Sequence, residues 1–193
     1  ICKSILKSKL GLIDNKIFAR KCSVSKVNKT EAKKFLQENH LQGACAIDSA
    51  YGLFYLNELV ACITYGTHHR GTTKKIILNR MCCKLNYLII GGFSKIFKYS
   101  LKDIDKEIIT WSDNRWSDGD VYKKLGFVLS GNIAPDYSYY KNGSYGKKRK
   151  SKQSMKKSNT GCPKNMTERE WCLENHYFRI WDCGKIRWSF VMD

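Results

Sequence analysis

The sequence predicts an α/β domain in which helices flank a mixed β-sheet. The first observation is an apolar run at residues 76–83 that leads through a glycine pair into an amphipathic segment. The second is a similar run at residues 108–113 that leads into the segment 119–127. Two strands that each feed a helix form a βαβα unit, and such strands lie side by side and parallel. The third is a pair of strand-like runs, residues 51–56 and 59–65, whose spacing predicts an antiparallel hairpin.

The N-terminal part is expected to add a helix and a strand to this domain. Residues 1–16 mix lysines with isolated Ile and Leu, which predicts either a short amphipathic helix or a linker. Residues 16–24 alternate enough to form a first strand. Thr30 is the expected N-cap of a helix that runs to about Asn39 and stops at His40-Leu41-Gln42-Gly43. In isolation, His40 fits a C-cap favoured by the helix dipole as well as it fits a functional side chain.

The domain is expected to span residues 17–141 and to close with an antiparallel pair, residues 128–130 with 137–140. Residues 142–165 combine Lys with Ser, Asn and Gly and lack apolar periodicity, which predicts a basic flexible arm. The alternative interpretation is a solvated tail or a localisation signal.

The C-terminal segment, residues 166–193, is expected to hold a short helix and a β-hairpin. Thr167 and Glu170 have the spacing of a capping box. Aromatic-rich runs at residues 177–182 and 185–190 flank a central Cys-Gly, so they predict the two strands of the hairpin.

The composition indicates a polyanionic partner. The 193 residues carry a net charge of +18 and 12% are aromatic, which favours nucleic acid first and an anionic membrane second. The competing explanation is an AT-rich genome that encodes many lysines. The side chains expected to contact DNA are Lys147, Lys148, Arg149, Lys150, Lys152, Arg179 and Arg187.

The nine cysteines include no CxxC pair, which predicts a reduced, cytoplasmic protein rather than a disulfide scaffold. No apolar run is long enough to cross a membrane, and we expect no membrane partner. The adjacent His68 and His69 lack a second ligand cluster nearby. Cys162, Cys172, His176 and Cys183 have long, irregular spacings, so we expect no metal site.

Polar residues at the ends of the central strands form the candidate site. Asp113 follows the second strand, where the sites of α/β proteins collect, although it also suits a turn. Tyr122 lies on the following helix, where it can donate a proton or simply pack on the sheet. Arg80 stands among apolar residues of the preceding strand and needs a partner, for which Asp113 is the natural candidate. The turn at Gly91 and Gly92 can present backbone N–H groups to a phosphate.

The order of these elements and the sequence Tyr122-Lys123-Lys124-Leu125-Gly126-Phe127 resemble the GNAT acyltransferase fold over residues 17–141. The resemblance implies an acyl-CoA cofactor, such as acetyl-CoA, and a tyrosine that protonates the departing thiolate. The cofactor-binding residues that it implies are Gly91, Gly92, Ser94 and Lys95.

Several motifs also resemble a domain found behind the nuclease of phage homing endonucleases, to which the phage Mom DNA-modification proteins are related. These motifs are His40-Leu41-Gln42-Gly43, Arg80-Met81-Cys82, Gly91-Gly92-Phe93-Ser94-Lys95, Ser112-Asp113-Asn114-Arg115-Trp116-Ser117 with Gly119 and Tyr122, and Ile180-Trp181-Asp182-Cys183-Gly184-Lys185. The resemblance implies a catalytic set of His40, Arg80, Asp113 and Tyr122. Mom proteins convert adenine in DNA to a carbamoylmethyl form.

The first hypothesis is therefore a phage GNAT-fold enzyme that modifies a base of double-stranded DNA in the host cytoplasm. The alternative is a DNA-binding, targeting domain of a homing endonuclease without transferase activity. A small-molecule or protein acetyltransferase is a third hypothesis, against which the charge argues. No GIY-YIG, HNH or Asp…Glu-x-Lys pattern is evident, and the chain starts at Ile1. A nuclease is therefore expected, if present, in a part upstream of this sequence.

Overall fold

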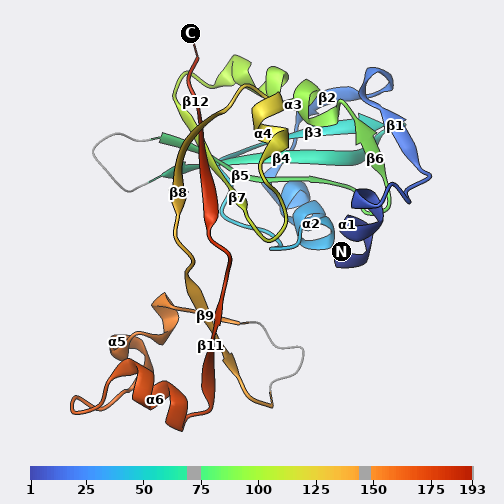
Figure 1. The fold of residues 1–193 in the computed structure, drawn as a ribbon. Helices are drawn as coiled ribbons and strands as arrows, with labels where there is room; N and C mark the ends of the chain where they lie inside the picture. Colours follow the sequence, from blue (N-terminus) through green and yellow to red (C-terminus); the bar gives the residue numbers. More distant parts are fainter. Residues whose placement is uncertain (69–74, 144–148, 193) are drawn as a thin grey trace. The chain divides into compact units, whose positions relative to one another are not determined.

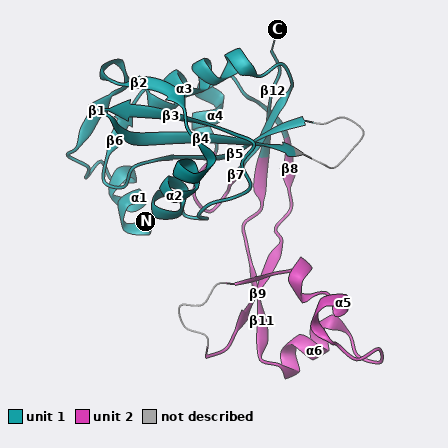
Figure 2. Cartoon of the chain, turned by 180° about the vertical axis from the view of Figure 1, so that it is seen from behind, with its two compact units in different colours: residues 1–111, 119–130, 187–193 teal, residues 112–118, 131–186 magenta. Residues whose placement is uncertain are grey.

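The computed structural model describes residues 1–68, 75–143 and 149–192. The chain divides into two compact units, shown in Figure 2. Unit 1 comprises Ile1–Trp111, Gly119–Ser130 and Arg187–Asp193, and unit 2 comprises Ser112–Asp118 and Gly131–Ile186. Each unit is therefore assembled from stretches that are separate in the sequence.

A seven-stranded mixed sheet has the order β2-β3-β4-β5-β7-β12-β8 (Figure 1). The strands are β2 (Ser23–Lys26), β3 (Ser49–Tyr55), β4 (Glu58–His68), β5 (Lys75–Cys83), β7 (Ile108–Asp113), β8 (Val128–Ile133) and β12 (Lys185–Phe190). Neighbours from β2 to β5 run antiparallel, whereas β5 and β7 run parallel. The predicted mixed sheet and parallel central pair are confirmed.

The hairpin between β3 and β4 turns on two residues, Leu56 and Asn57, with φ values of 48° and 65°. Two consecutive positive φ values are typical of the type I′ turn, whose twist matches that of the flanking strands. The predicted hairpin is confirmed.

The helices α2 (Lys29–Asn39) and α3 (Gly92–Ser100) cover opposite faces of this sheet. Phe35 and Leu36 of α2 share a buried cluster with Cys62, whereas Tyr65, three residues further along β4, bonds to Ser100 of α3. Since successive side chains of a strand alternate between faces, Cys62 and Tyr65 point to opposite sides. The N-cap of α2 is Asn28, whose side chain accepts a hydrogen bond from the Glu31 N–H at 2.8 Å, not the predicted Thr30.

Shorter elements complete unit 1. They are α1 (Cys2–Lys9), β1 (Lys16–Phe18), the 3-10 helices η1 (Ala19–Lys21) and η2 (Leu101–Asp103), β6 (Leu88–Ile90) and α4 (Asp120–Lys124). The strand predicted at residues 16–24 is two strands, because η1 interrupts it. The first piece, β1, pairs in parallel with β6 rather than joining the large sheet.

Unit 2 is built on a three-stranded sheet of order β10-β9-β11. Its elements are β9 (Tyr137–Lys141), β10 (Lys150–Ser151), η3 (Gln153–Met155), α5 (Lys157–Thr160), α6 (Glu168–Glu174) and β11 (Tyr177–Trp181). Tyr139 of β9 is buried against Met155 and Cys172, which form the core of the unit. The predicted capping box of Thr167 and Glu170 is confirmed at the start of α6.

Two strand pairings differ from the sequence prediction. Residues 128–130 belong to β8 of the large sheet, whereas residues 137–140 belong to β9 of the small one, so the predicted closing pair is wrong. The predicted C-terminal hairpin is also wrong: β11 pairs with β9, and β12 joins the large sheet. The local pattern identified these strands correctly but not their partners.

The N-cap glycine of α4 generates a stability prediction. Gly119 has a φ of +87°, and a Cβ there would lie 2.2 Å from Cζ2 of Trp188. We expect Gly119→Ala to lower the free energy of unfolding by about 2–4 kcal/mol, because it adds overpacking to backbone strain. Gly11→Ala is the control, since Gly11 has a φ of +71° but nothing within 4 Å. Equal losses for the two variants in urea unfolding would contradict the steric explanation.

Candidate functional site

The site begins where β5 and β7 part. The two strands pair at Ile76 with Ile108 and at Ile77 with Ile109. One residue further, the Thr110 hydroxyl donates a 3.0 Å hydrogen bond to the carbonyl of Leu78. On its other side β5 carries a bulge, because Tyr65 pairs with Leu78 and Thr64 with Arg80, which leaves Asn79 without a partner in the register. Bulges re-aim the side chains that follow them.

Arg80 follows this bulge and is half-buried. Its Nε donates to the carbonyl of Gly43 at 3.4 Å, and its Nη1 donates to the carbonyl of Asn79 at 2.8 Å. Within the described residues no carboxylate pairs with this guanidinium. A half-buried cation without a counter-charge is costly unless an anion or a developing negative charge comes to it.

His40 lies beside Arg80 through the turn that ends α2. The Gly43 N–H donates to the His40 carbonyl at 2.8 Å, and the Gln42 N–H donates to His40 Nδ1 at 3.1 Å. Burial, helped by the charge of Arg80, lowers the pKa of His40 from 6.5 to about 4. The ring is therefore neutral at pH 7, and since Nδ1 accepts, its hydrogen is on Nε2. In this state His40 presents a hydrogen-bond donor.

Tyr122 of α4 completes the cluster in unit 1. It is hydrogen-bonded to the Thr110 side chain and feels the charge of Arg80. Burial raises the pKa of Tyr122, and the contacts with Thr110 and Arg80 offset only part of that effect. The phenol is therefore protonated at neutral pH. Its ring packs against Phe127 and Trp188, with centroid distances of 5.6 and 6.2 Å.

The predicted phosphate-binding turn is the N-terminus of α3. Gly91 is its N-cap with a φ of 73°, no side chain caps the helix, and its first turn has no acidic residue. Ser94 in that turn is exposed. Lys95 points elsewhere: its Nζ donates to the carbonyls of Ala19 at 3.0 Å and Cys22 at 2.6 Å, which fixes η1.

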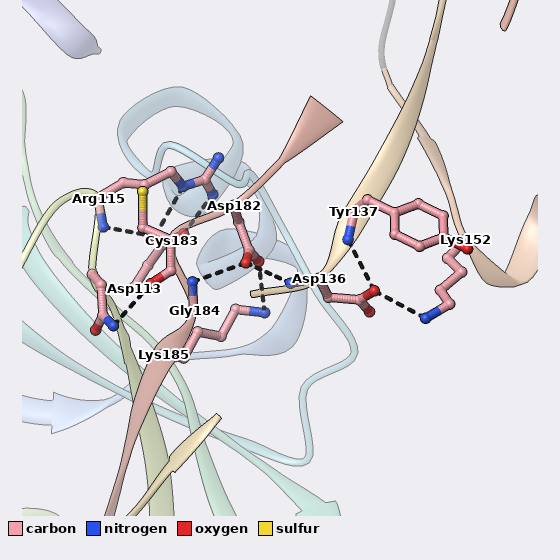
Figure 3. A network of polar contacts seen from close by, with 10 residues as sticks. Asp113, Arg115, Asp136, Tyr137, Lys152, Asp182, Cys183, Gly184 and Lys185 are labelled. Carbon is pink, nitrogen blue, oxygen red and sulfur yellow. Dashed lines mark hydrogen bonds and ion pairs between the residues drawn. The ribbon is translucent and has the colours of Figure 1, made fainter. Parts of the chain in front are cut away.

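Asp113, at the end of β7, belongs to unit 2, and its partner differs from the predicted one. Its Oδ1 accepts from the N–H and Nε of Arg115 at 3.1 and 2.9 Å, and Arg115 Nη2 lies 2.5 Å from Oδ2 (Figure 3). The hydrogen bonds from Arg115 lower the pKa of Asp113. A carboxylate held in this way is a weak base, so the expected pairing of Arg80 with Asp113 is replaced by a local one.

The turn after Asp113 is anchored on the loop before β12. Asn114 donates to the carbonyls of Cys183 at 3.0 Å and Gly184 at 3.2 Å. In the same network, Asp182 Oδ1 accepts from the N–H groups of Asp136 at 2.9 Å and Gly184 at 3.0 Å (Figure 3). These contacts give the Ser112–Ser117 motif a structural role within unit 2.

The predicted DNA-contacting residues fall into three groups. Lys147 and Lys148 lie outside the described residues. Arg149, Lys150, Lys152 and Arg179 belong to unit 2. Arg187 belongs to unit 1 and is half-buried, and its Nε is buried without a hydrogen-bond partner among the described residues.

Sequence reasoning missed Thr110, which links the parted strands to Tyr122. A threonine in an apolar strand, directly after the last residue of a parallel pair, gave no periodic signal. Among the described residues, no group of three His, Cys, Asp or Glu side chains could hold a metal ion. None of the described helices has the length and apolar character needed to span a membrane.

Comparisons with known proteins show the fold. Arabidopsis thaliana Naa50, in complex with the bisubstrate analogue CoA-Ac-MVNAL, aligns with a TM-score of 0.51 at 13% identity, over 89% of this chain and 99% of that one. The ribosomal-protein-S18-alanine N-acetyltransferase of Escherichia coli aligns with a TM-score of 0.50 at 9% identity, over 89% and 96%. A GNAT family acetyltransferase of Bacillus cereus gives 0.48 at 12% identity, over 89% and 98%. No family model and no curated protein sequence matches. The predicted GNAT fold is confirmed.

The neutral His40 generates a pH prediction. The unfolded chain protonates His40 near pH 6.5 and the folded chain only near pH 4, so stability is lost as the pH falls through this window. The loss is at most about 1.4 kcal/mol per pH unit. In His40→Asn the side-chain oxygen can replace Nδ1 as acceptor, but the side chain does not titrate. We therefore expect the free energy of unfolding of this variant to fall less than that of the wild type between pH 6.5 and pH 4. Parallel stability curves between pH 6.5 and 4 in urea unfolding would contradict the assignment.

Proposed function

We propose that this chain is an acyl-CoA-dependent transferase that acylates an adenine amine in DNA, adenine being also the base that the Mom proteins, which its motifs resemble, modify. The observation that carries the proposal is the cluster of Arg80, neutral His40 and protonated Tyr122 where β5 and β7 part. An unpaired cation, a neutral donor and a phenolic acid at one strand end are the parts that acyl transfer requires.

The residues present fit an acyl-CoA. The uncapped, acid-free N-terminus of α3 offers N–H groups to phosphates, with the exposed Ser94 hydroxyl beside them. The parted edges of β5 and β7 leave backbone groups for the amide-containing arm of the molecule. When bound, acyl-CoA would supply an activated thioester carbonyl.

The side chains of the cluster have distinct roles in this proposal. Arg80 stabilises negative charge that develops on the carbonyl oxygen, because no carboxylate of the described residues neutralises it. His40 donates its Nε2–H to the thioester carbonyl oxygen, and its low pKa keeps the ring neutral there. As the amine bonds to the carbonyl carbon and the C–S bond breaks, Tyr122 gives its phenolic proton, which its raised pKa retains at neutral pH, to the departing sulfur, and the surplus proton of the amine is lost to water.

DNA as the acceptor is supported by charge and by the motif resemblance. The net charge of +18 favours a polyanion, and a base must leave the helical stack before it can be modified. Action on phage or host DNA would place the protein in the host cytoplasm.

The second candidate is a DNA-binding, targeting domain of a phage homing endonuclease that lacks transferase activity. The local pairing of Asp113 with Arg115 favours it, since it occupies a residue that the Mom-type site would use. The hydrogen bonds from Lys95 to two backbone carbonyls also favour this candidate, because they occupy a side chain that cofactor binding would use.

Nucleoside analysis of plasmid DNA co-expressed with the chain tests the proposal. We expect a modified adenine by mass spectrometry, and a decrease of about 10²–10⁴-fold in the rate of its formation by Tyr122→Phe, because one general acid contributes about that much. Tyr87→Phe is the control, since Tyr87 lies in unit 1 and contacts Lys84 through its ring. Unmodified DNA together with tight, salt-sensitive binding would reject the enzyme and support the targeting domain.

A further inference from the structure

The small sheet of unit 2 carries aromatic and basic side chains on the same face. In its register Trp181 stands opposite Tyr137, and Arg179 stands opposite Tyr139. Side chains two residues apart on a strand share a face, so these four residues lie on one side of the sheet. Tyr139 is covered by the core of the unit, whereas Trp181 is 57% exposed.

Cations surround the exposed end of this face. The Trp181 and Tyr137 ring centroids are 5.0 Å apart. The Arg179 guanidinium lies 4.1 Å from the centroid of Tyr137, and Lys152 Nζ lies 4.7 Å from it. These contacts hold Tyr137 in place next to the large, exposed indole of Trp181. Each of the two cations also has a carboxylate nearby, Glu168 at 4.0 Å from Arg179 and Asp136 at 3.1 Å from Lys152.

The other end of the same face adds two cations without carboxylate partners. Lys141 Nζ and Lys150 Nζ lie 5.3 and 5.0 Å from the centroid of Tyr177, and both side chains are exposed. No ion pair involves either lysine within the described part of the chain. Unit 2 as a whole contains thirteen Lys and Arg against seven Asp and Glu, an excess of six positive charges.

We infer that this face of unit 2 binds single-stranded DNA, with Trp181 stacking on an unpaired base and Lys141, Lys150, Lys152 and Arg179 contacting phosphates. Aromatic platforms flanked by positive charge are the usual means of holding single strands. An exposed ring can stack only on a base whose face is free, and in a duplex the base faces are occupied by neighbours. Exposed Trp and Tyr side chains alone would also suit a protein partner. The excess of positive charge favours nucleic acid instead.

The choice of DNA rests on the proposed function, which requires an extruded base and hence an unpaired stretch. Binding is measured with no acyl donor present. A failure of the modification assay and a failure of single-strand binding are therefore separate results.

The test is fluorescence anisotropy of the full chain with one labelled oligonucleotide, offered as a single strand, as a duplex and as a duplex with a central bubble. We expect the wild type to prefer the single strand and the bubble. Trp181→Ala should weaken binding to both by roughly tenfold or more, the loss typical of one stacked base, and should change duplex binding little. Trp181→Phe, which keeps an aromatic face, should retain most of the affinity, and Trp181→Leu should not.

Phe178→Ala is the matched control. Phe178 is 45% exposed on the same strand, but its position three residues before Trp181 puts it on the opposite face. Its removal should leave binding unchanged. Equal losses for Phe178→Ala and Trp181→Ala, tighter binding to the duplex or to RNA of the same sequence, or no effect of Trp181→Ala would each overturn the inference.

Discussion

The parting of two parallel strands is the constraint on which the candidate site depends. β5 and β7 pair over two residue positions, after which their backbone groups no longer satisfy one another. The Thr110 hydroxyl donates a hydrogen bond to one of these groups, the carbonyl of Leu78. The bulge at Asn79 turns Arg80 toward the end of α2. Tyr122 is then brought to Thr110 because α4 follows β7 in the chain. His40, Arg80 and Tyr122, which come from three different elements, therefore meet where the ladder between these two strands ends.

The electrostatics of the site follow from the guanidinium of Arg80. A second positive charge beside Arg80 would be repelled in a half-buried setting, and His40 avoids this by remaining neutral. The same burial that keeps His40 deprotonated keeps Tyr122 protonated, because it disfavours the charged form of each. One physical cause thus yields a neutral imidazole and a neutral phenol around one guanidinium. Proton donors and positive charge are thereby collected with no carboxylate from the described part of the chain to neutralise the guanidinium.

The sequence was sufficient for features that local patterns determine. The β3–β4 hairpin, the parallel β5–β7 pair and the capping box of α6 each follow from residue spacing, and each is present. Strand partners were not predictable in the same way, because alternation in β11 and β12 defines a strand but says nothing about which sheet it joins. For the site, His40, Arg80 and Tyr122 come together, whereas Asp113 takes the neighbouring Arg115. An ion pair between residues two apart closes a very short loop, so its cost in chain entropy is small. It is therefore favoured over an ion pair with a residue on another strand.

The position of β12 has a consequence for how the protein reaches its native state. This strand lies between β7 and β8 inside the large sheet, yet it is the last strand along the described residues. The ladder on that side of β7 therefore cannot close until β12, which is distant from β7 in the sequence, has left the ribosome, and this long separation slows closure further. Until then β7 and β8 present unpaired edges, which are sites of aggregation. Deletion of β12 would therefore remove an interior strand of the large sheet rather than a peripheral segment.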